Sequence, residues 1–329
     1  MRISCPLVAL ALSATAAGSA LAQTAAGGAG QNFPSRPLRI IVPFPPGGGS
    51  DIVSRVVAQR LAESLGQAVV VENRPGASGN IGHALAAKAA PDGYTILLGS
   101  SNFVANPGLL KNNPYDALKD FAAVTYAAGS PNTVVVHPTF PAQTFKEFLT
   151  VTKANPGKYN FASPGTGTTS HLAAALLKVE GGVDMIHVPY SGAPLAALAV
   201  LGNHVPIGFI ALPPVQPHIK TGALRALAIT SPQRFSAAPE LPTIAESGFP
   251  GFESDTPQMF LVPAGTPKAV ITRLNMEIVR ILRLPEAKER LVGLGFDTVA
   301  SSPEETTRRI QSDVAKWTRV VKAAGIQID

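Results

Sequence analysis

Two short glycine-rich segments constrain the fold of this chain more than any other feature. They occupy residues 45–51 (PPGGGSD) and 163–170 (SPGTGTTS). Each follows a strand-like run and opens a helix-like run, namely 39–44 and 52–65 for the first and 158–162 and 171–179 for the second. Such a turn leaves unpaired backbone N–H groups at the positive end of a helix dipole, which favours an anion. We therefore expect two anion-binding loops, which a two-lobed protein can face across one cleft.

The amino terminus carries the pattern of a secretory signal peptide. An apolar stretch, residues 6–21, follows Arg2, and residues 20–22 (ALA) match a cleavage site before Gln23. This pattern predicts a signal peptide over residues 1–22 and export of the mature chain. A membrane anchor is the alternative, but the stretch is shorter than the roughly 20 residues that span a bilayer. The Gly/Ala/Pro-rich residues 23–36 predict a flexible lead-in.

Composition excludes several function classes. The single cysteine, Cys5, lies inside the expected signal peptide, so the mature chain has no disulfide, thiol nucleophile or Cys-ligated metal. Of 27 basic residues, 26 remain without Arg2 and face 21 acidic ones, so the net charge falls from +6 to +5. No basic block is present, and we expect no nucleic-acid partner. The length is sufficient for two domains.

Strand-like and helix-like segments alternate along the mature chain. The expected strands are 39–44, 68–72, 94–99, 132–137, 158–162, 184–188, 205–210, 224–230 and 258–262. The expected helices are 52–65, 80–89, 144–153, 171–179, 194–201, 267–284 and a last one that opens at Ser302. Continuous apolar strands between helices predict parallel sheets covered on both faces. We expect a first lobe of residues 37–130 plus 254–329 and a second lobe of residues 131–253.

The last helix has the clearest boundary. Residues 302–305 (SPEE) form a capping pattern with proline at the first helical position. Ile310, Val314, Trp317 and Val321 fall on one helical face. Trp317 is therefore expected in the core and not at a ligand.

Enzymatic and metal-dependent functions find little support. The chain contains no G-x-S-x-G elbow and no phosphate-binding P-loop. Ser170 and His171 are neighbours on a helix and point in different directions, so they cannot form a nucleophile–base pair. A triad assembled from distant residues stays open as an exported hydrolase. No metal-ligand spacing occurs among the histidines, which are His83, His137, His171, His187, His204 and His218. We expect no catalytic residue, metal or cofactor.

Polar groups around the loops suit a small carboxylate. Thr166, Thr168, Thr169 and Ser170 add hydroxyl donors to the backbone N–H groups of the second loop. A third polar turn, residues 100–102 (SSN), also follows a strand. Ligands of open α/β sheets bind beyond the carboxyl ends of strands, where all three loops lie.

Two of these polar residues also have a purely structural interpretation. Thr169 or Ser170 can be the N-cap of its helix. Asp51 is favoured as a cap of the first helix over a ligand contact.

The motifs resemble those of the Bug/TctC family of extracytoplasmic solute receptors. The matching segments are 42–51 (VPFPPGGGSD), 71–82 (VENRPGASGNIG), 91–95 (PDGYT), 187–192 (HVPYSG), 218–222 (HIKTG) and 263–267 (PAGTP). The resemblance implies a two-lobed, type II-like periplasmic-binding-protein fold, α/β in class, with mostly parallel sheets flanked by helices and joined by hinge strands. It also implies a periplasmic, non-enzymatic monomer that binds a small carboxylate for the membrane subunits of a tripartite tricarboxylate transporter.

The resemblance also implies a set of ligand-binding residues. Carried onto this chain, they are Gly48, Gly49, Ser50, Asp51, Ser101, Asn102, Thr166, Gly167, Thr168, Thr169 and His171, with Tyr190 and Ser191 nearby. A buried tyrosine bonded to a backbone carbonyl is the alternative interpretation of Tyr190. One segment departs from the family pattern: residues 205–211 (VPIGFIA) place Pro206 and Ile210 where aspartates are usual. We therefore expect a more apolar pocket at Ile210 and no preference for acidic amino acids.

The sequence leaves the ligand unnamed, because backbone-mediated recognition leaves few side-chain clues. A binding protein that serves as a sensor input is a further alternative to a transport receptor.

Overall fold

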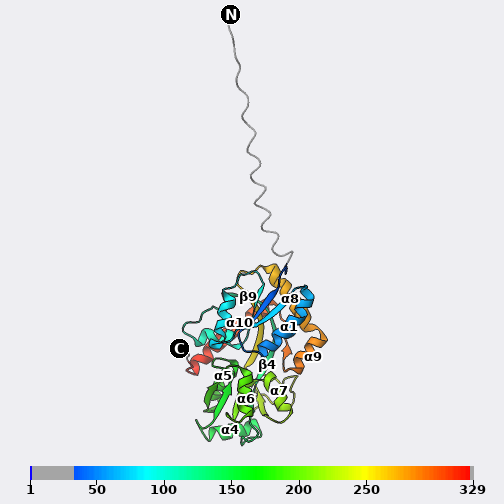
Figure 1. Ribbon diagram of the computed structural model, residues 1–329. Helices are drawn as coiled ribbons and strands as arrows, with labels where there is room; N and C mark the ends of the chain where they lie inside the picture. Colours follow the sequence, from blue (N-terminus) through cyan, green and yellow to red (C-terminus); the bar gives the residue numbers. More distant parts are fainter. Residues whose placement is uncertain (2–32, 327–329) are drawn as a thin grey trace. The chain divides into compact units, whose positions relative to one another are not determined.

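One long strand, β4, runs through both halves of the fold. Its first part pairs with β9, and its last part pairs with β7 and β8, all antiparallel. The change of partner falls between Pro131, which pairs with Asp255, and Asn132, which pairs with Ala211. These strands are β4 (Phe121–Val136), β7 (Ile207–Ala211), β8 (Arg225–Ile229) and β9 (Asp255–Pro263). The two lobes are therefore built around the two ends of one shared strand (Figure 1).

The computed structural model describes Met1 and residues 33–326. The expected signal peptide, apart from Met1, and residues 23–32 of the expected lead-in lie outside the described residues. The two lobes belong to one unit that begins at Pro34. Within the described residues, no helix combines the length and the apolar character needed to cross a membrane.

The first lobe is built on the strand order β2-β1-β3-β9-β4. β1 pairs in parallel with β2 and β3, and β9 then runs antiparallel to β3. The strands are β1 (Leu38–Val42), β2 (Val69–Asn73), β3 (Thr95–Gly99) and a short β10 (Asp297–Thr298) that pairs with β4. The helices are α1 (Gly49–Leu65), α2 (Asn80–Ala87), α3 (Ser101–Leu109), α8 (Lys268–Arg283), α9 (Pro285–Gly293) and α10 (Pro303–Ala323), with a short 3₁₀ turn at Ala77–Gly79.

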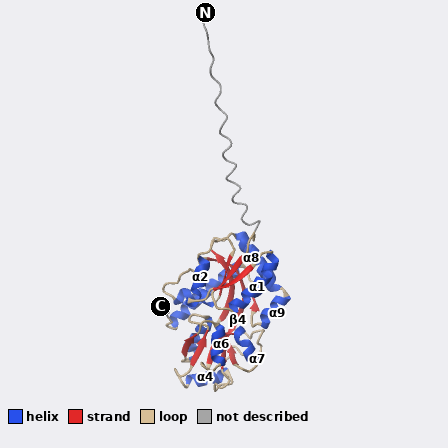
Figure 2. Ribbon diagram, viewed as in Figure 1, coloured by secondary structure: helices blue, strands red, loops and turns tan. Residues whose placement is uncertain are grey.

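The second lobe repeats this plan on the other end of β4. Its sheet runs β4-β7-β5-β6, in which β5 pairs in parallel with both β6 and β7. The remaining strands are β5 (Asn160–Ser163) and β6 (Ile186–Pro189). The helices are α4 (Phe145–Lys153), α5 (Thr169–Gly181), α6 (Ala193–Leu201) and α7 (Leu212–Lys220). In both lobes helices flank the strands, and the parallel pairing gives way to antiparallel pairing at the crossing strands (Figure 2).

Each lobe has its own apolar core. In the first lobe, Trp317 of α10 is buried in a cluster that includes Phe103 and Leu261, which confirms its expected core role. In the second lobe, Phe148, Phe161 and other apolar side chains fill the space between sheet and helices. Separate cores joined by a few strands allow the lobes to act as units.

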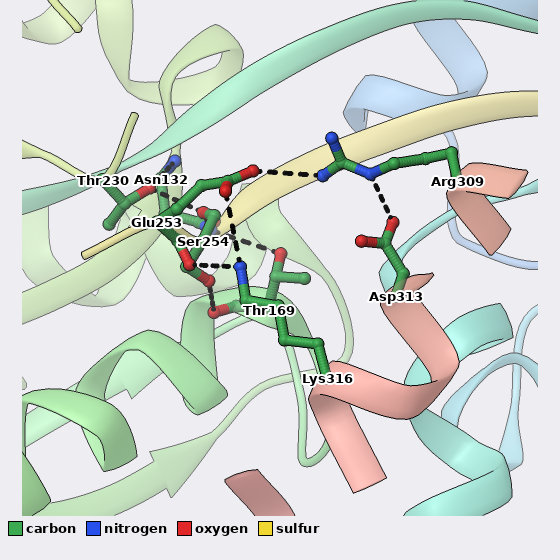
Figure 3. Close-up of polar contacts among 8 residues, drawn as sticks. All are labelled: Asn132, Thr169, Thr230, Glu253, Ser254, Arg309, Asp313 and Lys316. Atoms are coloured by element: carbon green, nitrogen blue, oxygen red, sulfur yellow. Dashed lines mark hydrogen bonds and ion pairs between the residues drawn. The ribbon is translucent and has the colours of Figure 1, made fainter. Parts of the chain in front are cut away.

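Ion pairs fasten the base of β9 to the last helix. Arg309 of α10 lies 3.3 Å from a carboxylate oxygen of Glu253, and its Nε donates to Asp313 at 2.8 Å. Lys316 Nζ donates to the backbone carbonyl of Glu253 at 2.9 Å (Figure 3). These contacts hold the chain where it re-enters the first lobe.

The capping box at α10 is confirmed and provides a stability test. Ser302 Oγ accepts from the Glu305 amide at 3.1 Å, and the Glu305 carboxylate accepts from the Ser302 amide. Ser302→Ala leaves the Glu305 amide without its acceptor, so we expect a loss of about 1 kcal/mol in the free energy of unfolding by urea. Thr307→Ala, in the next turn of the same helix, removes only an exposed hydroxyl bond to the Pro303 carbonyl and serves as the control. Equal losses for both variants would contradict the capping role.

Candidate functional site

Five helices begin around one cavity between the lobes. The N-cap residues of α1, α3, α5, α6 and α7 all line it, and these are Gly48, Ser100, Thr168, Gly192 and Ala211. The cavity has a volume of about 50 Å³. Its walls come from the carboxyl ends of strands in both lobes, as expected for a ligand site in this fold class. The positive ends of five helix dipoles therefore converge on one small space.

The α1 end presents backbone donors at the cavity. Its N-cap, Gly48, makes no side-chain cap bond, so the amides of Gly49 and Ser50 have no partner within the helix. A Cβ atom at Gly49 would lie 3.1 Å from the Phe296 ring, so only glycine allows this close approach without displacing the ring. Gly48, Gly49 and Ser50 of the expected site all line the cavity.

Asp51 does not line the cavity and is not the N-cap that we expected. It is the third residue of α1, and its carboxylate reaches back to accept the Gly47 amide at 3.0 Å. The same carboxylate accepts from Arg55 Nε and from Asn73 Nδ2, each at 3.0 Å. Burial raises the pKa of Asp51, but the bonds from Arg55, Gly47 and Asn73 outweigh it, so the pKa lies below its ordinary value. Asp51 thus holds the first glycine loop in its conformation through the Gly47 amide, although it does not line the cavity.

The α3 and α5 ends differ in how they are capped. Ser100 caps α3 without a side-chain bond, and Ser101 beside it lines the cavity. Thr168 caps α5, because its hydroxyl accepts the His171 amide at 3.3 Å, so neither Thr169 nor Ser170 is the N-cap. The first backbone amides of α1 and α3 therefore have no side-chain cap, whereas one amide of α5 is capped by Thr168.

The cavity wall carries polar and apolar parts. The residues that line it are Phe44, Pro45, Gly48, Gly49, Ser50, Ser100, Ser101, Pro164, Thr168, Ser170, Gly192, Ala193, Pro194, Ala211, Thr256, Gln258 and Phe296. None of these described residues carries a charged side chain. An anion here would be held by amides, hydroxyls and helix dipoles.

Several expected site residues lie in a neighbouring hollow. Thr166, Tyr190 and Ser191 line a space of about 340 Å³ next to Ser78 of the 3₁₀ turn. This hollow shares Phe44, Pro45, Pro164 and Gly192 with the cavity. Tyr190 is half-buried, whereas the alternative interpretation expected a buried tyrosine bonded to a backbone carbonyl. The two spaces together form one interlobe region.

Other expected residues make the contacts that shape the site. Asn102 is fully buried and donates from Nδ2 to the Thr166 carbonyl at 3.4 Å. Gly167 has a φ of +80° and packs so closely on Leu109 that a Cβ atom would lie 2.4 Å from Leu109 Cδ1. Both contacts join the two lobes directly.

Thr169 and Ile210 also lie away from the cavity. Thr169 is buried at the base of β9 (Figure 3). Ile210 is fully buried in a core cluster with Val135 and Val215. Its neighbour Ala211 lines the cavity in its place, because successive strand residues point to opposite faces. The apolar character expected at Ile210 is therefore carried by Ala211.

His171 does not line the cavity, and its Nδ1 accepts the Gly167 amide at 3.2 Å. Its ring stacks on His187 with centroids 3.9 Å apart, and both line a separate hollow with Phe161. Burial lowers the pKa of His171 to about 4 and, with the nearby His171 ring, the pKa of His187 to about 3. Both imidazoles are therefore neutral at pH 7.

One Ser–His contact bears on the alternative of a hydrolase. Ser163 Oγ lies 2.6 Å from His187 Nε2. Ser163 is fully buried and lines neither the cavity nor the neighbouring hollow, so a substrate cannot reach it. Among the described residues, no group of three or more His, Cys, Asp or Glu side chains could hold a metal ion.

Sequence reasoning missed several cavity residues, including three that come from the first lobe after residue 254. Thr256 and Gln258 line the cavity from β9, and Phe296 lines it from the loop before β10. The signal for the first two is their alternation within a buried strand, which places both side chains on one face. Phe296 carries no such signal, because a loop has no periodicity.

The Asp51 carboxylate yields a pH-dependent prediction. Asp51→Asn keeps the shape but removes the charge that holds Arg55 and the Gly47 amide, so at pH 7 we expect a loss of about 1–2 kcal/mol in stability. Because the folded pKa lies below the unfolded value, this stability is present above about pH 4 and disappears as the pH falls through the folded pKa.

The matched control is Asp92→Asn, which breaks an exposed ion pair with Arg36 and should change little. Urea denaturation of both variants at pH 7 and pH 3 measures the difference. A loss for Asp51→Asn that is as large at pH 3 as at pH 7 would contradict the role of its charge.

Comparisons with known proteins identify the family of this chain. The family model described as "Tripartite tricarboxylate transporter family receptor" (TctC) matches residues 53–326. The protein BugT of Bordetella pertussis is 36% identical over 90% of this chain and 91% of its own.

Two solved structures from Rhodopseudomonas palustris have the same fold. One, solved with adipate, has a TM-score of 0.86 and 32% identity over 90% of this chain and 100% of its own. MatC, solved with bound malate, has a TM-score of 0.82 and 29% identity over 88% of this chain and 100% of its own. The chain therefore belongs to the TctC family, whose members are periplasmic solute-binding receptors and not enzymes.

Proposed function

We propose that this protein captures a small carboxylate in the interlobe cavity. The observation that carries the proposal is the convergence of five helix N-termini on a space without charged side chains. Amides of Gly49, Ser50 and Ser101 supply donors for the carboxylate from the first lobe, and the α5 start closes over it from the second. The adipate-bound and malate-bound R. palustris relatives support this class of ligand.

The donors are sufficient for useful affinity. Hydrogen bonds to a charged group contribute roughly 1.5–3 kcal/mol each. Four or five of them, less an association cost of at least ~4 kcal/mol, correspond to dissociation constants in the micromolar range. Neither a metal nor a cationic side chain is required.

The cavity of about 50 Å³ has room for a carboxylate group, and the adjoining hollow of about 340 Å³ has room for the rest of a small ligand. Both spaces are lined by residues of both lobes, so the ligand enters when the lobes separate. We place the hinge on β4 and β9, with one lobe of residues 37–130 plus 254–329 and the other of residues 131–253. Ligand contacts to both lobes then favour the closed state.

The transport role completes the proposal. The protein is exported through the signal peptide over residues 1–22, works in the periplasm and delivers its ligand to membrane subunits of a tripartite tricarboxylate transporter. Acidic amino acids are poor ligands, because none of the described residues that line the cavity has a carboxylate to balance an ammonium group. A sensor role would show the same binding without a transport phenotype.

Two substitutions at Ser50 test the amide directly. Ser50→Pro removes the backbone N–H donor. The preceding residue, Gly49, has no Cβ atom that could clash with the new proline ring. We expect carboxylate affinity by calorimetry to fall about 10- to 150-fold, the equivalent of one charge-assisted bond. Ser50→Ala keeps the amide and should lose less than about tenfold.

A thermal-shift screen of carboxylic acids finds the ligand for this comparison. A true ligand raises the melting temperature with its concentration. If the Ser50→Pro variant binds the carboxylate as tightly as the wild type, the Ser50 amide does not donate to the ligand and this part of the proposal is wrong. If no carboxylic acid in a broad panel raises the melting temperature, the proposed function is wrong.

A further inference from the structure

One carboxylate stands without a partner at the point where the two lobes meet. Asp255 opens β9 and pairs with Pro131, the last residue of β4 that pairs with β9. The next residue of β4, Asn132, already pairs with Ala211 of the second lobe. Asp255 is half-buried, and its Oδ1 is fully enclosed and has no hydrogen-bond partner among the described residues. An ionised carboxylate that is removed from water without a partner is costly in free energy, and here that cost falls at the hinge.

The side chain of Asp255 lies behind the ligand site. Its neighbours on β9, Thr256 and Gln258, line the cavity. Successive strand residues point to opposite faces, so Asp255 faces the other side of the sheet. The last helix, α10, lies on that side, where it is bonded to Glu253 (Figure 3). Asp255 lines neither the cavity nor the neighbouring hollow, so it adjoins the ligand site without reaching the ligand.

The charges around Asp255 do not neutralise it. Arg309 Nε donates to Asp313 at 2.8 Å, and Arg309 Nη2 lies 3.3 Å from a carboxylate oxygen of Glu253. Lys316 Nζ donates to the Glu253 carbonyl at 2.9 Å and lies 3.7 Å from the Glu253 carboxylate. Both cations are therefore engaged by other acidic residues. The titratable side chains that face Asp255 are Tyr126 of β4, Glu253 of the preceding segment, and Arg309, Asp313 and Lys316 of α10.

Asp255 is the group in this cluster that exchanges a proton near neutral pH. Burial and, to a smaller extent, the charge of Glu253 raise the pKa of Asp255 to about 7, although the two cations act in the opposite direction. Asp313 is the nearest rival, because burial raises its pKa as well, but Arg309 is bonded to it. Burial also raises the pKa of Tyr126, so this phenol stays protonated.

The cluster spans the proposed hinge. In the proposed division, Glu253 ends the second lobe, whereas α10 belongs to the first. The ion pairs from Arg309 and Lys316 to Glu253 therefore join the two lobes. A rotation about β4 and β9 moves Glu253 relative to α10, which opens the packing around Asp255 to water.

We infer that Asp255 is a proton switch for lobe closure. Its protonated form favours the closed lobes, and its ionised form favours the open lobes, where water can solvate the charge. The inference rests on the hinge that the proposed function places on β4 and β9, and it adds a control of that hinge by pH.

The sign and size of the effect follow from proton linkage. The closed form has the higher pKa, so closure is favoured as the pH falls below about 7 and is lost as the pH rises through this value. In the open form we take the ordinary pKa of an aspartate, about 3.9. The ratio of closed to open molecules then rises up to about 30-fold between pH 8 and pH 5.5.

Lobe separation can be measured without any ligand. α2 and α6 begin on opposite sides of the neighbouring hollow, because their N-caps, Gly79 and Gly192, both line it. In a Cys5→Ser background, Lys88→Cys at the end of α2 and Leu198→Cys on α6 give one exposed label site in each lobe. Electron–electron resonance between two spin labels then reports the open and closed populations from pH 5.5 to pH 8.5. We expect the closed population to grow on acidification.

Variants of the cluster identify the group responsible. Asp255→Asn keeps the shape of the side chain but cannot ionise, so the closed population should stay high at every pH. Glu253→Gln removes a negative neighbour and frees both cations, so the transition should move to lower pH. Asp92→Asn, which breaks an exposed ion pair with Arg36, is the control and should keep the wild-type transition. Thermal unfolding checks that each variant is folded.

Several outcomes would overturn the inference. These are populations that do not respond to pH, an open population that grows on acidification, and an unchanged transition in Asp255→Asn. A carbon NMR titration of the wild type gives a test that needs no folded variant: an Asp255 carboxyl that stays ionised down to pH 4 overturns the switch.

The result is independent of the search for the ligand. If no carboxylic acid binds, the proposed function fails, whereas the pH response of the ligand-free lobes still decides the inference. If the screen finds a ligand, calorimetry should show its affinity rising on acidification in the wild type and staying level in Asp255→Asn. An equal pH dependence of affinity in both proteins would count against the switch.

Discussion

The structure depends on unpaired backbone amides at helix starts. Glycine turns after β1 and β5 bring the first residues of α1 and α5 to one point, and α3, α6 and α7 begin at the same place. Such amides need a partner, and nothing with a positive charge is required to attract an anion to them. Gly49, which packs against Phe296, shows how closely the backbone must approach for this geometry.

Much of this arrangement could be predicted from the sequence. The glycine turns, the parallel strands and the capping box of α10 follow from local chemistry. The first part of β4 was missed because it contains many alanines together with Gly129 and Pro131. α7 was missed because of its prolines, yet Pro213 and Pro214 stand in the first turn, where no N–H bond is lost.

The division of roles inside the site was harder to predict. Of the expected set, Gly48 to Ser50, Ser101 and Thr168 line the cavity, whereas the side chains of Asp51 and His171 make their contacts elsewhere. Which way a polar side chain faces depends on tertiary partners that lie far away in the chain. Thr256 and Gln258 reach the cavity only because β9 crosses between the lobes.

The shared strand has a consequence for how the chain folds. Asn132 and Thr256 touch although they stand 124 positions apart, and the whole second lobe lies between them. Contacts of such long sequence separation form slowly, because a large loop must close first. We therefore expect the pairing of β4 with β9 to be completed late in folding, after the local contacts within each lobe have formed.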